Sequence, residues 1–183
     1  MRPIAPPDYL AGYPAHLADS VREAIACGKL GGILLKTYPQ PHDVRTDRSL
    51  YDYVQAMRNR YLKNSAPLSK VAYDSKLQLL HKALGTHSTV PRVQGGKLKA
   101  KREIRVAGIF RDMPDAFLRM IVVHELAHLK ESEHNKAFYQ LCQHMEAQYF
   151  QLEFDLRAYL TYLDAGGEPL WPSTTNPTPG ADG

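Results

Sequence analysis

The sequence predicts an α+β fold with a small, mostly antiparallel sheet. Three observations favour it. Apolar residues recur at helical spacing in two stretches before residue 65, and short apolar segments lie between Asp, Gly and Pro residues from 70 to 110. A helix start signal near Pro114 and helical spacing from 135 to 163 then follow. Helices and strands that follow one another in blocks are typical of an α+β domain.

Two amphipathic helices are expected in the N-terminal part. Residues 15–27 carry Leu17, Val21 and Ile25 on one stripe, and Gly28 follows as a stop signal. The stretch from Asp47 to Asn64 repeats the spacing more strongly. Its apolar stripe consists of Leu50, Tyr53, Val54, Met57, Tyr61 and Leu62.

Short strands are expected after Pro67, which breaks the helical pattern. Gly95 and Gly96 suggest a hairpin or an approach loop between two of them. The expected strands are Lys70 to Tyr73, Leu77 to His81, Thr89 to Val93, Lys97 to Ala100 and Glu103 to Phe110.

A long helix is expected to begin near Pro114, because proline is tolerated in a first helical turn and the neighbouring carboxylates complement the helix dipole. It should run to about Lys130. After a break near Ser132, residues 135–163 are expected to form two helices, or one helix kinked between residues 146 and 149.

The length of 183 residues fits a single domain, which we place at residues 1–163. The tail, residues 164–183, is rich in proline and glycine and lacks a periodic apolar face. We expect it to be disordered or loosely draped, with Trp171 isolated within it.

The composition argues against a membrane protein, since the longest apolar clusters fall far short of the roughly 20 residues that span a bilayer. The first ten residues lack the pattern of a secretory signal. Cys27 and Cys142 lie far apart, which favours reduced thiols. A cytoplasmic location is therefore expected, and the oligomeric state stays open.

The residues most informative about function are His124, Glu125 and His128, which form the pattern H-E-x-x-H. Histidines four positions apart on a helix project from the same face and can reach one zinc ion. The intervening glutamate can act on a water activated by that zinc. We therefore expect a Zn²⁺ cofactor, with His124 and His128 as ligands and Glu125 as the general base.

A catalytic zinc site commonly has three protein ligands and one open position. His134, six residues after His128, is the first candidate for the third ligand. Glu146 and Glu153 are the alternatives, because some zinc hydrolases take a glutamate from a downstream helix. His144 and the hydroxyls of Tyr139 and Tyr149 are weaker candidates for a catalytic role, with core packing or structural hydrogen bonds favoured for each.

The sequence resembles the YgjP-like metallopeptidase family over about Tyr9 to Leu163. The similar segments are VVHELAHLKESEHNKAFYQLC, the upstream VQGGKLKAKREIRVA and the downstream QLEFDLRAYL. A more distant similarity extends to SprT-like and Spartan-type metalloproteases. The resemblance implies a zincin-like fold, with His124, His128 and His134 as metal ligands. It also implies either peptidase activity or the UTP pyrophosphatase activity associated with the family name.

Three functions remain open at this point. The first is a metallopeptidase that binds an extended peptide against residues 103–110, taken as an edge strand. The second is a nucleoside triphosphate pyrophosphatase acting on UTP, although no Gly-rich P-loop is present. The third is a non-catalytic zinc-binding module, which is disfavoured because structural sites usually have four protein ligands that include cysteine.

A basic run bears on the choice of substrate. Six cations lie within fourteen residues with one opposing glutamate, and clustered cations attract phosphate groups. The run is either a solvated strand face or a phosphate contact surface beside the active site. Its residues are Arg92, Lys97, Lys99, Lys101, Arg102 and Arg105.

Overall fold

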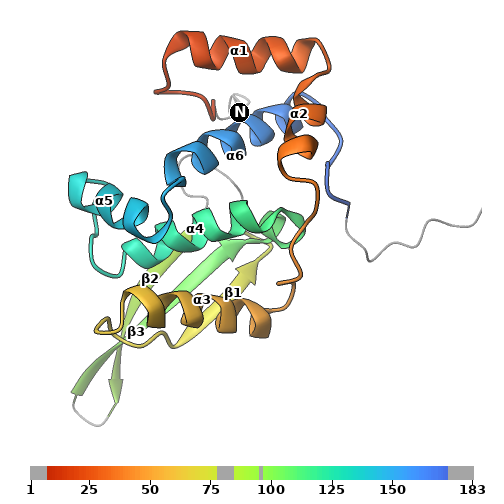
Figure 1. Ribbon diagram of the computed structural model, residues 1–183. Coiled ribbons are helices and arrows are strands. Elements are labelled where there is room, and N and C mark those ends of the chain that lie inside the picture. Colours follow the sequence, from red (N-terminus) through yellow and green to blue (C-terminus); the bar gives the residue numbers. More distant parts are fainter. Residues whose placement is uncertain (1–7, 78–84, 95–96, 173–183) are drawn as a thin grey trace, which may run out of the picture.

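The computed structural model describes residues 8–77, 85–94 and 97–172, with the side chains of 85–101 left out (Figure 1). Within these residues the fold is α+β, as predicted. The elements in chain order are α1 (Ala15–Ala26), α2 (Leu30–Thr37), α3 (Asp47–Tyr61), β1 (Lys70–Asp74), β2 (Gly85–Gln94), β3 (Lys97–Ala107), the 3-10 helix η1 (Gly108–Asp112), α4 (Asp115–Ala127), α5 (Lys136–Met145) and α6 (Tyr149–Asp164).

The sheet is mixed, so the expected antiparallel arrangement holds for the pairing of β2 with β3 and not for that of β1 with β3. Its strand order is β1-β3-β2, with β1 parallel to β3 and β2 antiparallel to β3. β2 follows β1 in the chain but lies on the other side of β3. Because no hairpin joins β1 directly to β3, the two strands can run parallel. Pro91 lies in β2, at an edge of the sheet, where a missing backbone N–H is tolerated.

β3 joins two segments that the sequence pattern separates. Pairing with β2 continues from Lys97 to Val106 without a break, so the charged residues in between do not end the strand. The strand ends at Ala107, and Phe110 lies in η1. Most of the strand expected at 77–81 lies outside the described residues, and Leu77 itself is not part of a strand.

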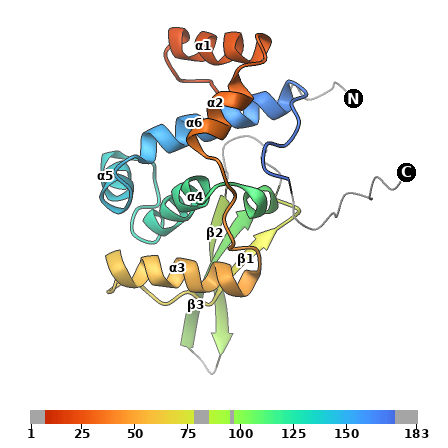
Figure 2. The ribbon, with the colours of Figure 1, turned by 45° about the vertical axis from the view of Figure 1, so that its right-hand side comes forward.

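Helix α4 lies between the sheet and α6, while α3 packs beside β1 (Figures 1 and 2). α4 is apolar on nearly every side because both neighbours cover it. Phe117, Leu118, Val122 and Val123 are fully buried. Ile104 and Val106 of β3 are also fully buried. The predicted active-site helix is therefore a central element of the core.

Helix α2 does not follow from the sequence pattern, because Gly31 and Gly32 weaken the helical signal. Packing explains it. Leu34 is buried, and α2 packs against α6. A Cβ added at Gly31 would lie 3.2 Å from a side-chain carbon of Leu170, so the glycine permits a close approach.

The segment after α6 is not loosely draped over residues 165–172. Trp171 is 3% exposed and its indole N–H donates to the carbonyl of Tyr38 over 2.8 Å. Its ring contacts Phe117 and Tyr159 edge-on. The expectation for the remainder of the tail, 173–183, falls outside the described residues. Among the described helices, none combines the length and apolar character needed to span a bilayer.

Candidate metal centre

Three histidines meet at the C-terminal end of α4. His124 lies in the last turn of α4, His128 caps the helix, and His134 lies in the turn before α5. The Nε2 atom of His134 is 3.2 Å from Nε2 of His124 and 3.0 Å from Nε2 of His128. Across the described residues, this is the group of His, Cys, Asp and Glu side chains whose ligand atoms converge closely enough to hold a metal ion.

The cluster fits a transition metal by the spacing of its nitrogen atoms. Tetrahedral zinc with Zn–N bonds of about 2.0–2.1 Å separates its ligand nitrogens by roughly 3.3–3.4 Å. The observed separations are within a few tenths of an ångström of this value. Three imidazoles without a cysteine also leave room for a fourth, exchangeable ligand, as in catalytic sites.

The two helical histidines have partners for their other ring nitrogens. Nδ1 of His128 is 3.0 Å from the carbonyl oxygen of Glu131, which can only accept, so Nδ1 carries the proton and Nε2 keeps its lone pair. Nδ1 of His124 is 2.7 Å from the hydroxyl of Tyr149. Such contacts set the tautomer and orientation of metal-binding histidines.

Tyr149 is fully buried and is the first residue of α6. Burial raises the pKa of Cys142 to about 12, and the interaction of its thiol with the Tyr149 hydroxyl acts in the opposite direction. The hydroxyl oxygen of Tyr149 can accept from Nδ1–H of His124, which would leave Nε2 of that ring with its lone pair. Tyr149 therefore contacts and orients His124, in agreement with the structural hydrogen bond favoured from the sequence.

Glu125 is 1% exposed, and its Oε2 atom has no hydrogen-bond partner among the described residues. Burial raises the pKa of Glu125 to about 8. A buried carboxyl oxygen without a partner is costly for the fold. Such a group, next to His124 in the chain, is typical of a residue retained for chemistry rather than for stability.

The alternative third ligands are occupied elsewhere. Glu146 forms an ion pair with Arg119, and Glu153 forms one with Arg157 over 3.1 Å. His144 lies against the ring of Tyr61 and is not in the histidine cluster. The ring of Tyr139 lies 6.3 Å from that of His134. The ring of Phe138 is buried and contacts all three histidines.

The basic run does not form a single surface in the part whose side chains are described. Side chains alternate along a strand, so Arg102 shares the face of Ile104 while Arg105 points to the other face. Arg102 donates to the carbonyl of Leu129 over 3.1 Å, next to His128. The side chains of Arg92, Lys97, Lys99 and Lys101 lie outside the described residues.

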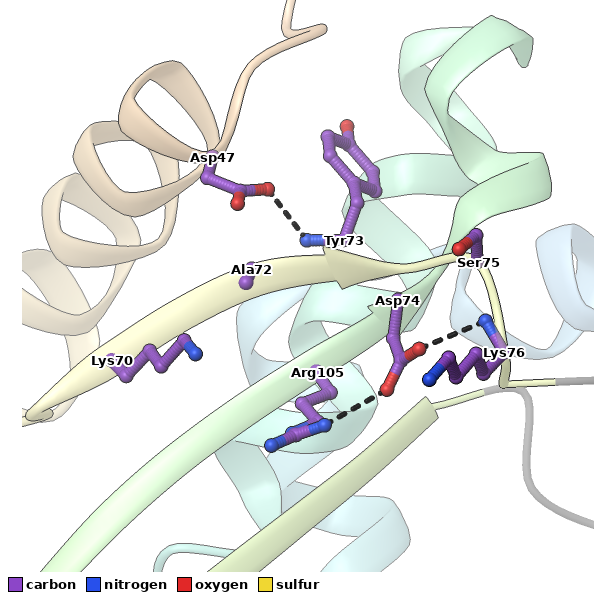
Figure 3. A pocket seen from close by; sticks show the side chains of 8 residues that line it. All are labelled: Asp47, Lys70, Ala72, Tyr73, Asp74, Ser75, Lys76 and Arg105. Atoms are coloured by element: carbon purple, nitrogen blue, oxygen red, sulfur yellow. Dashed lines mark hydrogen bonds and ion pairs between the residues drawn. The ribbon is translucent and has the colours of Figure 1, made fainter.

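Arg105 lines a cavity of about 310 Å³ beside β1 (Figure 3). There it donates to Asp74 over 2.9 Å and lies 3.8 Å from Glu103. Its charge is therefore paired on the sheet face away from α4. The cavity is lined by Asp47, Lys70, Ala72, Tyr73, Asp74, Ser75, Lys76 and Arg105.

Comparison with known proteins identifies the relationship. The family model described as YgjP-like, metallopeptidase domain, matches residues 75–159. A protein of Escherichia coli (strain K12) named UTP pyrophosphatase is 60% identical over 158 residues, which cover 86% of this chain and 95% of the relative. This chain belongs to the YgjP-like family. No solved structure matches it.

The YgjP-like chain is a hydrolase, as both matches indicate. The matched residues 75–159 contain all three clustered histidines and Glu125. The family and the cluster together indicate a metal ion at the C-terminal end of α4.

Proposed function

We propose that this chain is a zinc-dependent nucleoside triphosphate pyrophosphatase acting on UTP. UTP is proposed as the substrate because the chain is 60% identical to the relative named UTP pyrophosphatase, over 95% of that protein's length. The hydrolytic chemistry is supported by the cluster of three imidazole nitrogens and by the buried Glu125, which follows His124 in the chain.

The structure removes the geometric reason for a peptide substrate at residues 103–110. That binding mode requires an edge strand, because a peptide adds to unpaired backbone groups. β3 is instead the central strand and pairs with β1 and β2 on its two sides. The prediction that residues 103–110 form an edge strand is wrong, because β3 lies between β1 and β2 in the sheet.

In the proposed reaction His124, His128 and His134 hold the zinc. When bound, zinc polarises a phosphoryl oxygen and makes a neighbouring water more acidic. Glu125 takes a proton from the attacking water. The water oxygen bonds to the α-phosphorus, the bond from that phosphorus to the bridging oxygen breaks, and UMP and pyrophosphate leave. The proton passes from Glu125 to the products.

The supporting residues hold this arrangement in place. Tyr149 and the carbonyl of Glu131 fix the two helical imidazoles. Arg102 donates to the carbonyl of Leu129, just after the C-terminal end of α4, where a cation is favourable. Phosphate contact remains part of the proposal for Arg92, Lys97, Lys99, Lys101 and Arg102, whereas Arg105 is paired with Asp74 on the other face of the sheet.

The proposal is tested with zinc-loaded enzyme and UTP, with pyrophosphate release as the measurement. Glu125→Gln should keep the metal and lose roughly 100-fold or more in kcat, because proton transfer typically contributes that much. Glu133→Gln, which changes an exposed carboxylate in the neighbouring turn, serves as the matched control and should retain turnover.

Unstructured peptides are assayed in parallel. Cleavage of peptides without release of pyrophosphate from UTP would overturn the proposed substrate. Full UTP turnover by the Glu125→Gln enzyme would instead remove Glu125 from the mechanism.

A further inference from the structure

An aromatic pair lies on the surface beside the histidine cluster. Phe150, the second residue of α6, is 47% exposed, and Tyr139 of α5 is partly exposed. Their ring centroids are 5.4 Å apart with an angle of 34° between the ring planes. A single exposed phenylalanine is ordinary on a protein surface. A tilted pair that adjoins a metal centre is a more specific feature.

The pair is connected to the metal centre through its neighbours. The ring of Tyr139 lies 6.3 Å from the ring of His134. Phe150 directly follows Tyr149, the residue that orients His124, and the two rings are 5.5 Å apart. α6 carries both Tyr149 and Phe150, and α5, which follows His134, carries Tyr139. The same two helices therefore position both aromatic rings.

We propose that Tyr139 and Phe150 form a stacking surface for the base of the nucleoside triphosphate. This inference rests on the proposed function, which places the phosphates at the histidine cluster. A base is flat and presents a π-face, and stacking on an aromatic side chain contributes about 1–3 kcal/mol. The pair adjoins His134, so a nucleotide with its phosphates at the cluster can extend its base over these rings.

Stacking predicts a particular kind of specificity. Every base has a π-face, so the surface binds different bases without reading their hydrogen-bonding edges. The pair should therefore lower the KM for all four common nucleoside triphosphates. Selection of UTP among them requires other groups.

The test measures kcat and KM for UTP in zinc-loaded variants. Phe150→Ala and Tyr139→Ala should raise KM on the order of tenfold, with kcat changed much less, since stacking holds the base and not the reacting phosphate. Phe150→Trp should restore a near-native KM, while Phe150→Leu should resemble Phe150→Ala. Ile33→Ala, which shortens a side chain that is 53% exposed on α2, is the matched control.

Zinc content is measured in every variant, because Tyr139 also adjoins His134. If Tyr139→Ala loses zinc, the Phe150 series decides the matter. A KM within twofold of the wild type in Phe150→Ala, or equal behaviour of the leucine and tryptophan variants, would overturn the stacking surface and leave the proposed function intact. Absence of UTP hydrolysis in the wild type would overturn both.

Discussion

At the scale of single residues, the three histidines differ in how they are held. His124 and His128 have hydrogen-bond partners at Nδ1, from Tyr149 and from the backbone of Glu131. His134 is exposed, and its ring contacts Phe138 at a centroid distance of 4.7 Å. Its position beside the other two nitrogens is what a third ligand requires.

His134→Ala should lower zinc affinity about as much as His128→Ala, because each change removes one of three proposed ligands. Zinc content after dialysis against a chelator is the measurement. His144→Ala is the matched control on α5, and Glu146→Ala tests the rejected glutamate ligand. Both should keep zinc. Loss of zinc in Glu146→Ala with retention in His134→Ala would assign the third position to the glutamate.

At the scale of elements, the start of α5 determines where His134 lies. Asn135 is the N-cap of this helix, and its side-chain oxygen accepts the backbone N–H of Phe138 over 2.9 Å. The helix start therefore fixes the residue immediately after the proposed ligand. α5 also carries Phe138, which packs against all three histidines.

Asn135→Ala should reduce the free energy of unfolding by about 1 kcal/mol, as is usual for loss of an N-cap. It should also weaken zinc binding, because the turn that carries His134 loses its anchor. Thr46→Ala is the matched control, since Thr46 caps α3 in the same way, away from the histidines. Denaturant unfolding and zinc titration measure the two effects. Equal zinc affinity in Asn135→Ala and Thr46→Ala would show that the N-cap of α5 does not support zinc binding.

At the scale of the whole molecule, residues after α6 complete the core around α4. The indole of Trp171 packs on Phe117 of α4 and on Tyr159 of α6. Its N–H binds the carbonyl of Tyr38, just after α2. One side chain thus joins three helical regions on the side of α4 away from the sheet.

Trp171→Ala should lower the free energy of unfolding by about 3 kcal/mol or more, as expected for truncation of a buried aromatic side chain. Thermal or denaturant unfolding of the metal-free protein is the measurement. Leu17→Ala, at a position that is 38% exposed, should change stability much less. A Trp171→Ala protein as stable as the control would show that the segment is dispensable for the core.

Local sequence patterns determined the elements and the chemistry of the candidate site. Helical spacing predicted α1 and α3, and the start signals near Pro114 predicted α4. Of the two arrangements expected for residues 135–163, the structure has two helices, α5 and α6. His124 and His128 were predicted to lie together because four positions on one helix fix their relative placement. Their roles as zinc ligands, like that of His134, stay predictions until a metal is measured.

Tertiary structure decided what depends on contacts between distant segments. Strand order made β3 central, because β1 and β2 approach it from opposite sides. Packing against α6 formed α2 despite Gly31 and Gly32, and buried Trp171 in a segment without periodicity. A hydrogen bond between helices places the Tyr149 hydroxyl against His124. Ion pairs with Arg119 and Arg157 hold Glu146 and Glu153 away from the histidines. Spacing along a chain fixes neighbours on one element, whereas pairing between elements depends on the surfaces that the whole fold buries together.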